Sequence, residues 1–159
     1  MKRGRSIEEL AVEIDRQQKS KRDFIGDTRT MSVTDDLKLR VPTEASTTGA
    51  GDTIPVRSTA LRQLTDRVGI PSKYAAKLEE AAPDLLADNI NHWLWAKPEQ
   101  RMVRTLDGEV RGFLSDRYHR IDNYDVAETV LPILAETPGL KIVSTEITER
   151  KLYIRAVNT

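Results

Sequence analysis

Arginine and aromatic side chains gather between residues 101 and 120 of the 159-residue chain. Guanidinium groups hold phosphates through paired hydrogen bonds, and exposed aromatic rings stack on unpaired bases. A stretch that interleaves the two residue types therefore predicts contact with nucleic acid, and a salt-bridged loop around a buried tyrosine is the alternative. The candidate binding residues in this stretch are Arg101, Arg104, Arg111, Arg117, Tyr118 and Arg120.

The hairpin expected within this stretch raises a question of charge. Two strand-like runs flank the dipeptide Asp107-Gly108, which is typical of a type I′ turn. Counting outward from the turn places Arg104 directly opposite Arg111. Like charges at opposed positions of an antiparallel pair are destabilising, so this pair calls for an anion. The anion is either a bound phosphate or a carboxylate of the chain itself, from Glu109, which lies two residues from Arg111 in the sequence, or from another acidic residue.

Both tryptophans of the chain, Trp93 and Trp95, lie in or directly after a helix predicted to start at Pro83. Trp93 continues the apolar stripe that includes Leu86 and Ile90, so we expect it in the core. Trp95 falls off this stripe and is a candidate for stacking on bases. Packing in the core or at an oligomer interface is the alternative for both rings.

Few residues are suited to catalysis or metal binding. The chain has no cysteine and two histidines, His92 and His119, which excludes disulfides, thiolate nucleophiles and cysteine zinc sites. A triad of Ser115 and His119 with Asp116 or Asp122 would have to form within one short connection, where such side chains rarely converge. We therefore expect no catalytic residue, metal or cofactor, and a hydrolase using His119 is the remaining enzymatic alternative.

The charge balance limits where nucleic acid could bind. Lysine and arginine match aspartate and glutamate, 25 against 25, so the chain as a whole does not attract nucleic acid or an anionic membrane. A binding site must be a local patch. The basic start is followed by Glu8 and Glu9 where a signal peptide needs an apolar run, and no segment is apolar enough to span a bilayer. We expect a protein of the bacterial cytoplasm without a membrane partner.

Hydrophobic periodicity predicts an α+β fold in which antiparallel β-hairpins pack with several short helices. Residues 1–22 are expected to form a basic N-terminal helix or arm with a capping box at Ser6 and Glu9. Residues 23–159 are expected to form a single domain that continues beyond the end of the chain, with a flexible loop over 43–57. The other predicted elements are three helices between Ser58 and Trp93, the hairpin, a helix capped by Asn123, and strands at 141–147 and 151–157.

The helices on either side of Gly69 have the spacing of a helix-turn-helix, which would read DNA with the second helix. Pro71 follows the turn directly, and the second helix offers only Ser72, Lys73 and Lys77 for contacts. These features weaken the interpretation, because any helix pair linked by glycine has similar spacing.

Several segments together resemble a known family. They are Gly69 to Tyr74, Leu86 to Leu94, Val103 to Thr105 and Arg111 to Asn123, and the most specific part is Arg104 to Asn123. Over roughly residues 25–134 the chain resembles the phage- and plasmid-associated family called domain of unknown function 932. The resemblance implies a mobile-genetic-element setting and a longer chain, and it implies no particular activity.

These observations predict a phage- or plasmid-encoded accessory protein that binds single-stranded or recombining nucleic acid. The expected contacts are the hairpin arginines, the connection from Arg117 to Arg120, Trp95 and the basic N-terminal arm. The alternative is a structural or protein-interaction domain whose tryptophans lie in a core or in a homo-oligomer interface.

Overall fold

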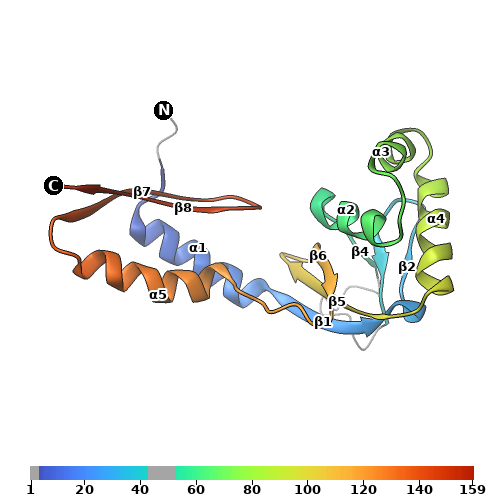
Figure 1. Cartoon of the computed structure of the whole chain (residues 1–159), viewed down its shortest axis with the longest axis horizontal. Helices are drawn as coiled ribbons and strands as arrows, with labels where there is room; N and C mark the ends of the chain where they lie inside the picture. The colour runs from blue at the N-terminus through green and yellow to red at the C-terminus, as the bar shows by residue number, and fades with distance from the viewer. Residues whose placement is uncertain (1–3, 43–52) are drawn as a thin grey trace. The chain divides into compact units, whose positions relative to one another are not determined.

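The computed structural model describes residues 4–42 and 53–159 (Figure 1). The fold is α+β with antiparallel hairpins, which confirms the predicted class. Among the described residues no helix is both long and apolar enough to cross a membrane. The elements are α1 (Ile7–Ser20), β1 (Arg22–Asp27), the 3₁₀ helix η1 (Thr28–Thr30), β2 (Ser32–Val33), β3 (Leu39–Arg40), β4 (Thr53–Ile54), α2 (Ser58–Arg67), α3 (Ser72–Ala81), α4 (Pro83–Ala96), β5 (Gln100–Leu106), β6 (Glu109–Ser115), α5 (Asn123–Glu136), β7 (Leu140–Ile147) and β8 (Leu152–Asn158).

The chain divides into two compact units, each with its own buried cluster. The described residues of unit 1 are 4–19 and 119–159, and unit 2 is Ser20–Tyr118. This differs from the predicted division into an arm over 1–22 and one domain over 23–159. Helix α1 is no isolated arm, because Leu10 and Ile14 on its apolar face are buried in one cluster with Ala127 of α5.

Unit 1 consists of α1, α5 and the hairpin of β7 and β8. The capping box at the start of α1 is confirmed, since the Glu9 amide donates to Ser6 Oγ at 3.2 Å and the Ser6 amide to Glu9 Oε2 at 2.9 Å. The predicted cap of α5 is wrong by one residue. Asp122, with extended backbone angles, is the N-cap, and Asn123 is the first helical residue.

Unit 2 contains two three-stranded antiparallel sheets, in the orders β1-β5-β6 and β2-β3-β4, together with helices α2, α3 and α4. The tight turn between β5 and β6 is confirmed, because Asp107 and Gly108 both have positive φ, 54° and 74°. Ser20 holds this turn: its hydroxyl donates to Asp107 Oδ1 at 2.7 Å and accepts from the Asp107 amide at 3.0 Å.

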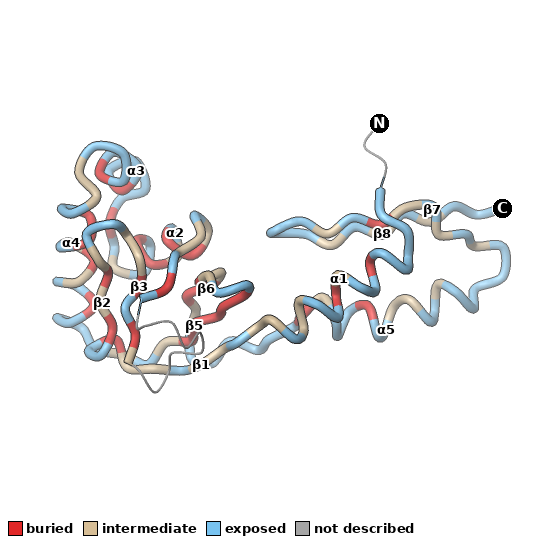
Figure 2. The backbone as a smooth tube through the Cα atoms, turned by 180° about the vertical axis from the view of Figure 1, so that it is seen from behind, coloured by how far each residue is buried: buried red, intermediate tan, exposed pale blue. Residues whose placement is uncertain are grey.

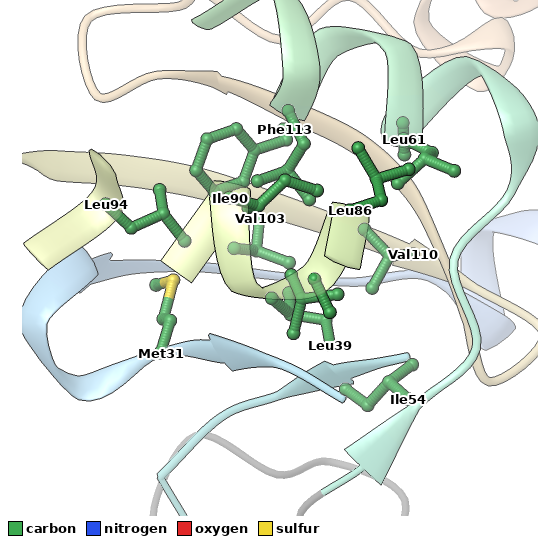
Figure 3. Packing of buried hydrophobic residues seen from close by; sticks show 14 of the residues in the cluster. Met31, Leu39, Ile54, Leu61, Leu86, Ile90, Leu94, Val103, Val110 and Phe113 are labelled. Atoms are coloured by element: carbon green, nitrogen blue, oxygen red, sulfur yellow. The ribbon is translucent and has the colours of Figure 1, made fainter. Parts of the chain in front are cut away.

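The core of unit 2 lies between these sheets and helices (Figure 3). Phe113 of β6 is the largest of its fully buried side chains, and Val103 of β5, Leu86 and Ile90 of α4 and Met31 complete its centre. Each such side chain contributes about 1.5–3 kcal/mol by leaving water. Figure 2 shows that most buried positions belong to unit 2, so this unit provides the rigid scaffold for any site on it.

The predicted flexible loop over 43–57 is partly outside the described residues, which resume at Thr53. From there the chain is ordered by hydrogen bonds and burial. Ile54 is 1% exposed in β4, and residues 55–57 run beside β6, where the Val110 amide donates to Pro55 O and the Arg57 amide to Val110 O. The loop prediction is therefore wrong for 53–57, because an apolar residue at 54 draws this segment into the core.

Candidate nucleic-acid interface

Arg104 lies in the interior of unit 2 and is neutralised from the neighbouring strand. Its side chain is 9% exposed, and Nε donates a 3.2 Å hydrogen bond to Oδ2 of Asp23, whose side chain is 3% exposed. Asp23 is the partner of Arg104 in the register of β1 and β5, so both side chains project from one face of the sheet. A buried and paired guanidinium is not available to a phosphate. We therefore do not assign Arg104 to nucleic-acid binding.

A β-bulge changes the predicted register of the hairpin. The pairing steps from Thr105 with Val110 to Arg104 with Gly112, so that Arg111 is the extra residue on β6. The prediction that Arg104 faces Arg111 is therefore wrong. The argument for a phosphate held between two opposed arginines no longer applies, because the carboxylate of Asp23 takes that place for Arg104.

Arg101 is mostly buried at the start of β5. Its guanidinium carbon lies 5.2 Å from the centre of the Phe113 ring, and its Nε lies 3.9 Å from Oε1 of Glu99. Burial lowers the pKa of Arg101, and the nearby Glu99 carboxylate opposes this effect. An arginine remains protonated all the same. Arg101 therefore contributes a fixed positive charge beside Glu99, and little of its side chain is exposed for direct contact with a ligand.

The turn that follows β6 exposes two of the predicted residues. The Arg117 amide donates to Ser115 Oγ at 3.2 Å and the Tyr118 amide to Ser115 O at 3.1 Å, which fixes a compact turn. Arg117 is exposed and Tyr118 is 44% exposed, so the alternative of a loop around a buried Tyr118 is wrong. Ser115 is the strand partner of Arg101, which places this turn beside Arg101.

Arg120 is exposed but belongs to unit 1, and it is therefore described apart from the arginines of unit 2. His119 is also in unit 1, whereas Ser115 and Asp116 are in unit 2. Asp122 serves as the N-cap of α5. The four polar residues considered for a triad thus belong to different parts of the fold and have separate structural settings.

The two tryptophans of α4 are both exposed, Trp93 to 44% and Trp95 to 50%. The expectation that Trp93 is part of the core is wrong, because Ile90 and Leu94 fill the buried stripe and Trp93 lies at its edge. Trp95 is exposed as predicted, and its indole Nε1 donates to Met31 O at 2.8 Å. This hydrogen bond anchors one edge of the Trp95 ring to the scaffold.

A pocket that sequence reasoning missed lies at the C-terminal ends of α2 and α4. Its volume is about 420 Å³, and Arg67, Gly69, Trp93, Lys97 and Glu99 are among its lining residues. These residues come from α2, the turn after it, α4 and the connection between α4 and β5, so no local motif indicates them. The one signal in the sequence was the pair of tryptophans, and the pocket uses Trp93 where Trp95 was expected.

Glu99 is held rigidly on one side of this pocket. Arg67 donates two hydrogen bonds to its carboxylate through Nε and Nη2, and these hydrogen bonds are the main cause of the lowered pKa of Glu99. The backbone of Glu99 is bound to the buried Thr28: its amide donates to Thr28 Oγ1 at 3.1 Å and its carbonyl accepts from the Thr28 amide at 2.9 Å. Glu99 therefore stays ionised and fixed at neutral pH.

These contacts join the pocket to the turn after β6. We call the resulting surface the basic strip, in which Glu99 connects Arg67 to Arg101, and Arg101 connects to the turn through Ser115. In the part of the chain that the structure describes, Lys97 and Arg117 form no ion pair. The basic strip consists of Arg67, Trp93, Lys97, Glu99, Arg101, Arg117 and Tyr118.

Across residues 4–42 and 53–159, the structure contains no group of three or more histidine, aspartate or glutamate side chains placed to hold a metal ion. Comparison with protein families, curated proteins and solved structures finds no match to the chain.

Proposed function

We propose that unit 2 binds single-stranded nucleic acid along the basic strip. The observation that carries this proposal is the combination of two exposed cations without ion pairs among the described residues, Lys97 and Arg117, with two half-exposed rings, Trp93 and Tyr118. Cations attract the phosphates, and the rings offer flat faces to the bases. All of these side chains belong to unit 2, whose core supports them.

The composition of the basic strip favours a single strand over a duplex. Bases of a duplex are stacked on each other, so exposed rings gain nothing from them, whereas an unpaired strand can turn its bases onto Trp93 and Tyr118. The carboxylates of Glu99 and Asp116 reduce the positive charge that a duplex would need. Binding that depends partly on stacking needs less positive charge, which agrees with the balanced charge of the chain.

The earlier candidates take different places in this proposal. Within the basic strip, Arg101 lies over the Phe113 ring and near Glu99, and Trp95 lies on the same helix as Trp93. Arg111 and Arg120 are not assigned to the basic strip. Residues 4–19 of the predicted basic arm belong to unit 1 and residues 20–22 to unit 2, and residues 1–3 lie outside the described residues. The phage or plasmid setting and a cytoplasmic location remain proposals that rest on the resemblance and on composition.

Binding of a short single-stranded oligonucleotide tests this proposal. We expect the full chain to bind oligothymidylate at low ionic strength and to bind a duplex of equal length more weakly, as measured by fluorescence anisotropy. The logarithm of the affinity should fall with the logarithm of the salt concentration, with a slope of about −0.7 for each phosphate contacted, hence about −1.4 for Lys97 and Arg117 together. Absence of binding at low ionic strength would refute the proposal.

A second candidate, self-association through unit 1, is favoured by the apolar surface of that unit. Its buried cluster consists of Leu10, Ile14 and Ala127, whereas Ile133 of α5 is 61% exposed and Val126, seven residues earlier on the same helix, is 36% exposed. Positions seven apart lie on one side of a helix, so the two side chains form an apolar stripe. A second copy of the chain would cover this stripe with its own.

Sedimentation of the full chain tests self-association. We expect wild-type protein to sediment as a dimer at high concentration and Ile133→Glu to sediment as a monomer, because a carboxylate cannot be buried without a partner. Ala135→Glu, an exposed change on the opposite side of the same helix, is the control for added negative charge. A wild-type protein that stays monomeric at every concentration would remove this candidate.

A further inference from the structure

The pocket between the ends of α2 and α4 has the features of a site for a flat, polar-edged ring. We infer that it receives one unstacked nucleobase of the bound strand, an inference that rests on the proposed function and makes it more specific. The volume of about 420 Å³ is sufficient for one base together with water. Gly69 is among the residues that line the pocket, and a Cβ built on it would meet nothing within 4 Å.

Trp93 provides the stacking surface. Its ring is 44% exposed although it belongs to a well-packed helix, and His92 contacts it edge-on, with ring centres 4.8 Å apart and an interplanar angle of 89°. An edge contact fixes the orientation of the indole, which reduces the entropy that a stacking base would otherwise cost. Large exposed rings that are held in place are the usual platforms for unpaired bases.

A base stacked on Trp93 also needs polar partners for its hydrogen-bonding edge, and Arg67 and Glu99 provide them. The two hydrogen bonds between them hold the guanidinium and the carboxylate side by side, and the anchored backbone of Glu99 fixes the pair. A guanidinium donates and a carboxylate accepts, so together they present a donor next to an acceptor. The hydrogen-bonding edge of a base carries acceptors and donors side by side in the same way.

Lys97 supplies the phosphate contact next to the base. It follows α4 directly, four residues after Trp93, and its amide donates to Trp93 O at 3.2 Å. It is exposed and forms no ion pair within residues 4–42 and 53–159. A nucleotide with its base on Trp93 would therefore have a cation close to its phosphate.

An abasic strand, which keeps the phosphates but lacks the bases, tests the base pocket separately from phosphate binding. The test uses the full chain with Trp95→Phe, so that Trp93 is the only tryptophan, and compares oligothymidylate with an abasic strand of equal length. We expect oligothymidylate to quench Trp93 fluorescence, and the abasic strand to bind roughly 5- to 150-fold more weakly without quenching. Trp93→Ala, in the wild-type background, should reduce the difference in affinity between the two strands in anisotropy measurements, and stacking on Tyr118 accounts for the difference that remains.

The results that would overturn the inference are distinguishable. If oligothymidylate binds without quenching Trp93, the base pocket is wrong and binding along the basic strip stands. If the abasic strand binds as tightly as oligothymidylate, the base pocket is wrong and only the phosphate contacts of the proposed function stand. If neither strand binds at low ionic strength, the proposed function is wrong and the inference falls with it. His92→Ala, which removes the edge contact and keeps the pocket charges, should lower the affinity for oligothymidylate less than Trp93→Ala does.

Discussion

Replacing Arg104 with alanine is expected to lower the free energy of unfolding of unit 2 by about 3–5 kcal/mol, the usual cost of breaking a buried ion pair. The change would leave the Asp23 carboxylate, whose side chain is 3% exposed, without its guanidinium partner. A buried charge that loses its partner keeps the full cost of leaving water. Urea unfolding followed by tryptophan fluorescence measures this effect, because both tryptophans belong to unit 2.

Two control variants show whether the ion pair is responsible. Arg117→Ala, an exposed arginine of the same unit, should change the free energy of unfolding by less than about 0.5 kcal/mol. The double change Asp23→Leu with Arg104→Met replaces the ion pair by apolar side chains and should recover most of the loss. An Arg104→Ala protein as stable as wild type would mean that Arg104 is solvated, and it would return Arg104 to the candidates for phosphate binding.

Replacing Phe113 with alanine is expected to cost about 3–5 kcal/mol of stability in the same measurement, because a large aromatic side chain leaves a cavity in the core. Phe113 is 1% exposed and is the largest of the fully buried side chains. The change also removes the ring beneath Arg101, so nucleic-acid affinity should fall in the fraction that remains folded.

Ile25→Ala is the matched control for Phe113→Ala. Ile25 lies in the same three-stranded sheet but is 53% exposed, so its truncation should cost under about 1 kcal/mol. Equal losses from the two changes would contradict the assignment of Phe113 to the centre of the core. A Phe113→Ala protein that loses stability but binds oligothymidylate normally would show that Arg101 does not support the basic strip.

Local features of the fold could be predicted from the sequence. The Asp107-Gly108 turn and the Ser6 capping box each depend on a few adjacent residues, and both are present. The predicted pairing of the hairpin strands is wrong beyond Thr105 and Val110, because counting residues outward from the turn assumes that neither strand contains a bulge. The shift between Arg104 and Thr105 accompanies a contact from outside the hairpin, since the Phe113 amide donates to Gln63 Oε1 of α2 at 2.8 Å.

The candidate site could not be predicted from the sequence, because its residues and their partners are far apart along the chain. The acid that neutralises Arg104 comes from β1, 81 residues away along the chain. The pocket combines Arg67, Trp93 and Glu99, which lie on separate segments of the chain and meet only in the folded unit. Composition indicated arginines and aromatic rings near residue 100, and only the fold distinguishes the exposed Arg117 and Tyr118 from the buried Arg104.

The most direct test of binding along the basic strip is the salt dependence of oligothymidylate affinity in two double variants. Lys97→Ala with Arg117→Ala removes the two exposed cations of the basic strip that form no ion pair within the described residues, and Lys73→Ala with Lys77→Ala removes two exposed cations of α3. We predict that the first pair reduces the salt slope by about 1.4 and weakens binding, while the second leaves both unchanged. The opposite result, with binding lost only in the α3 variant, would contradict the proposal and place the contact on the second helix of the α2 and α3 pair.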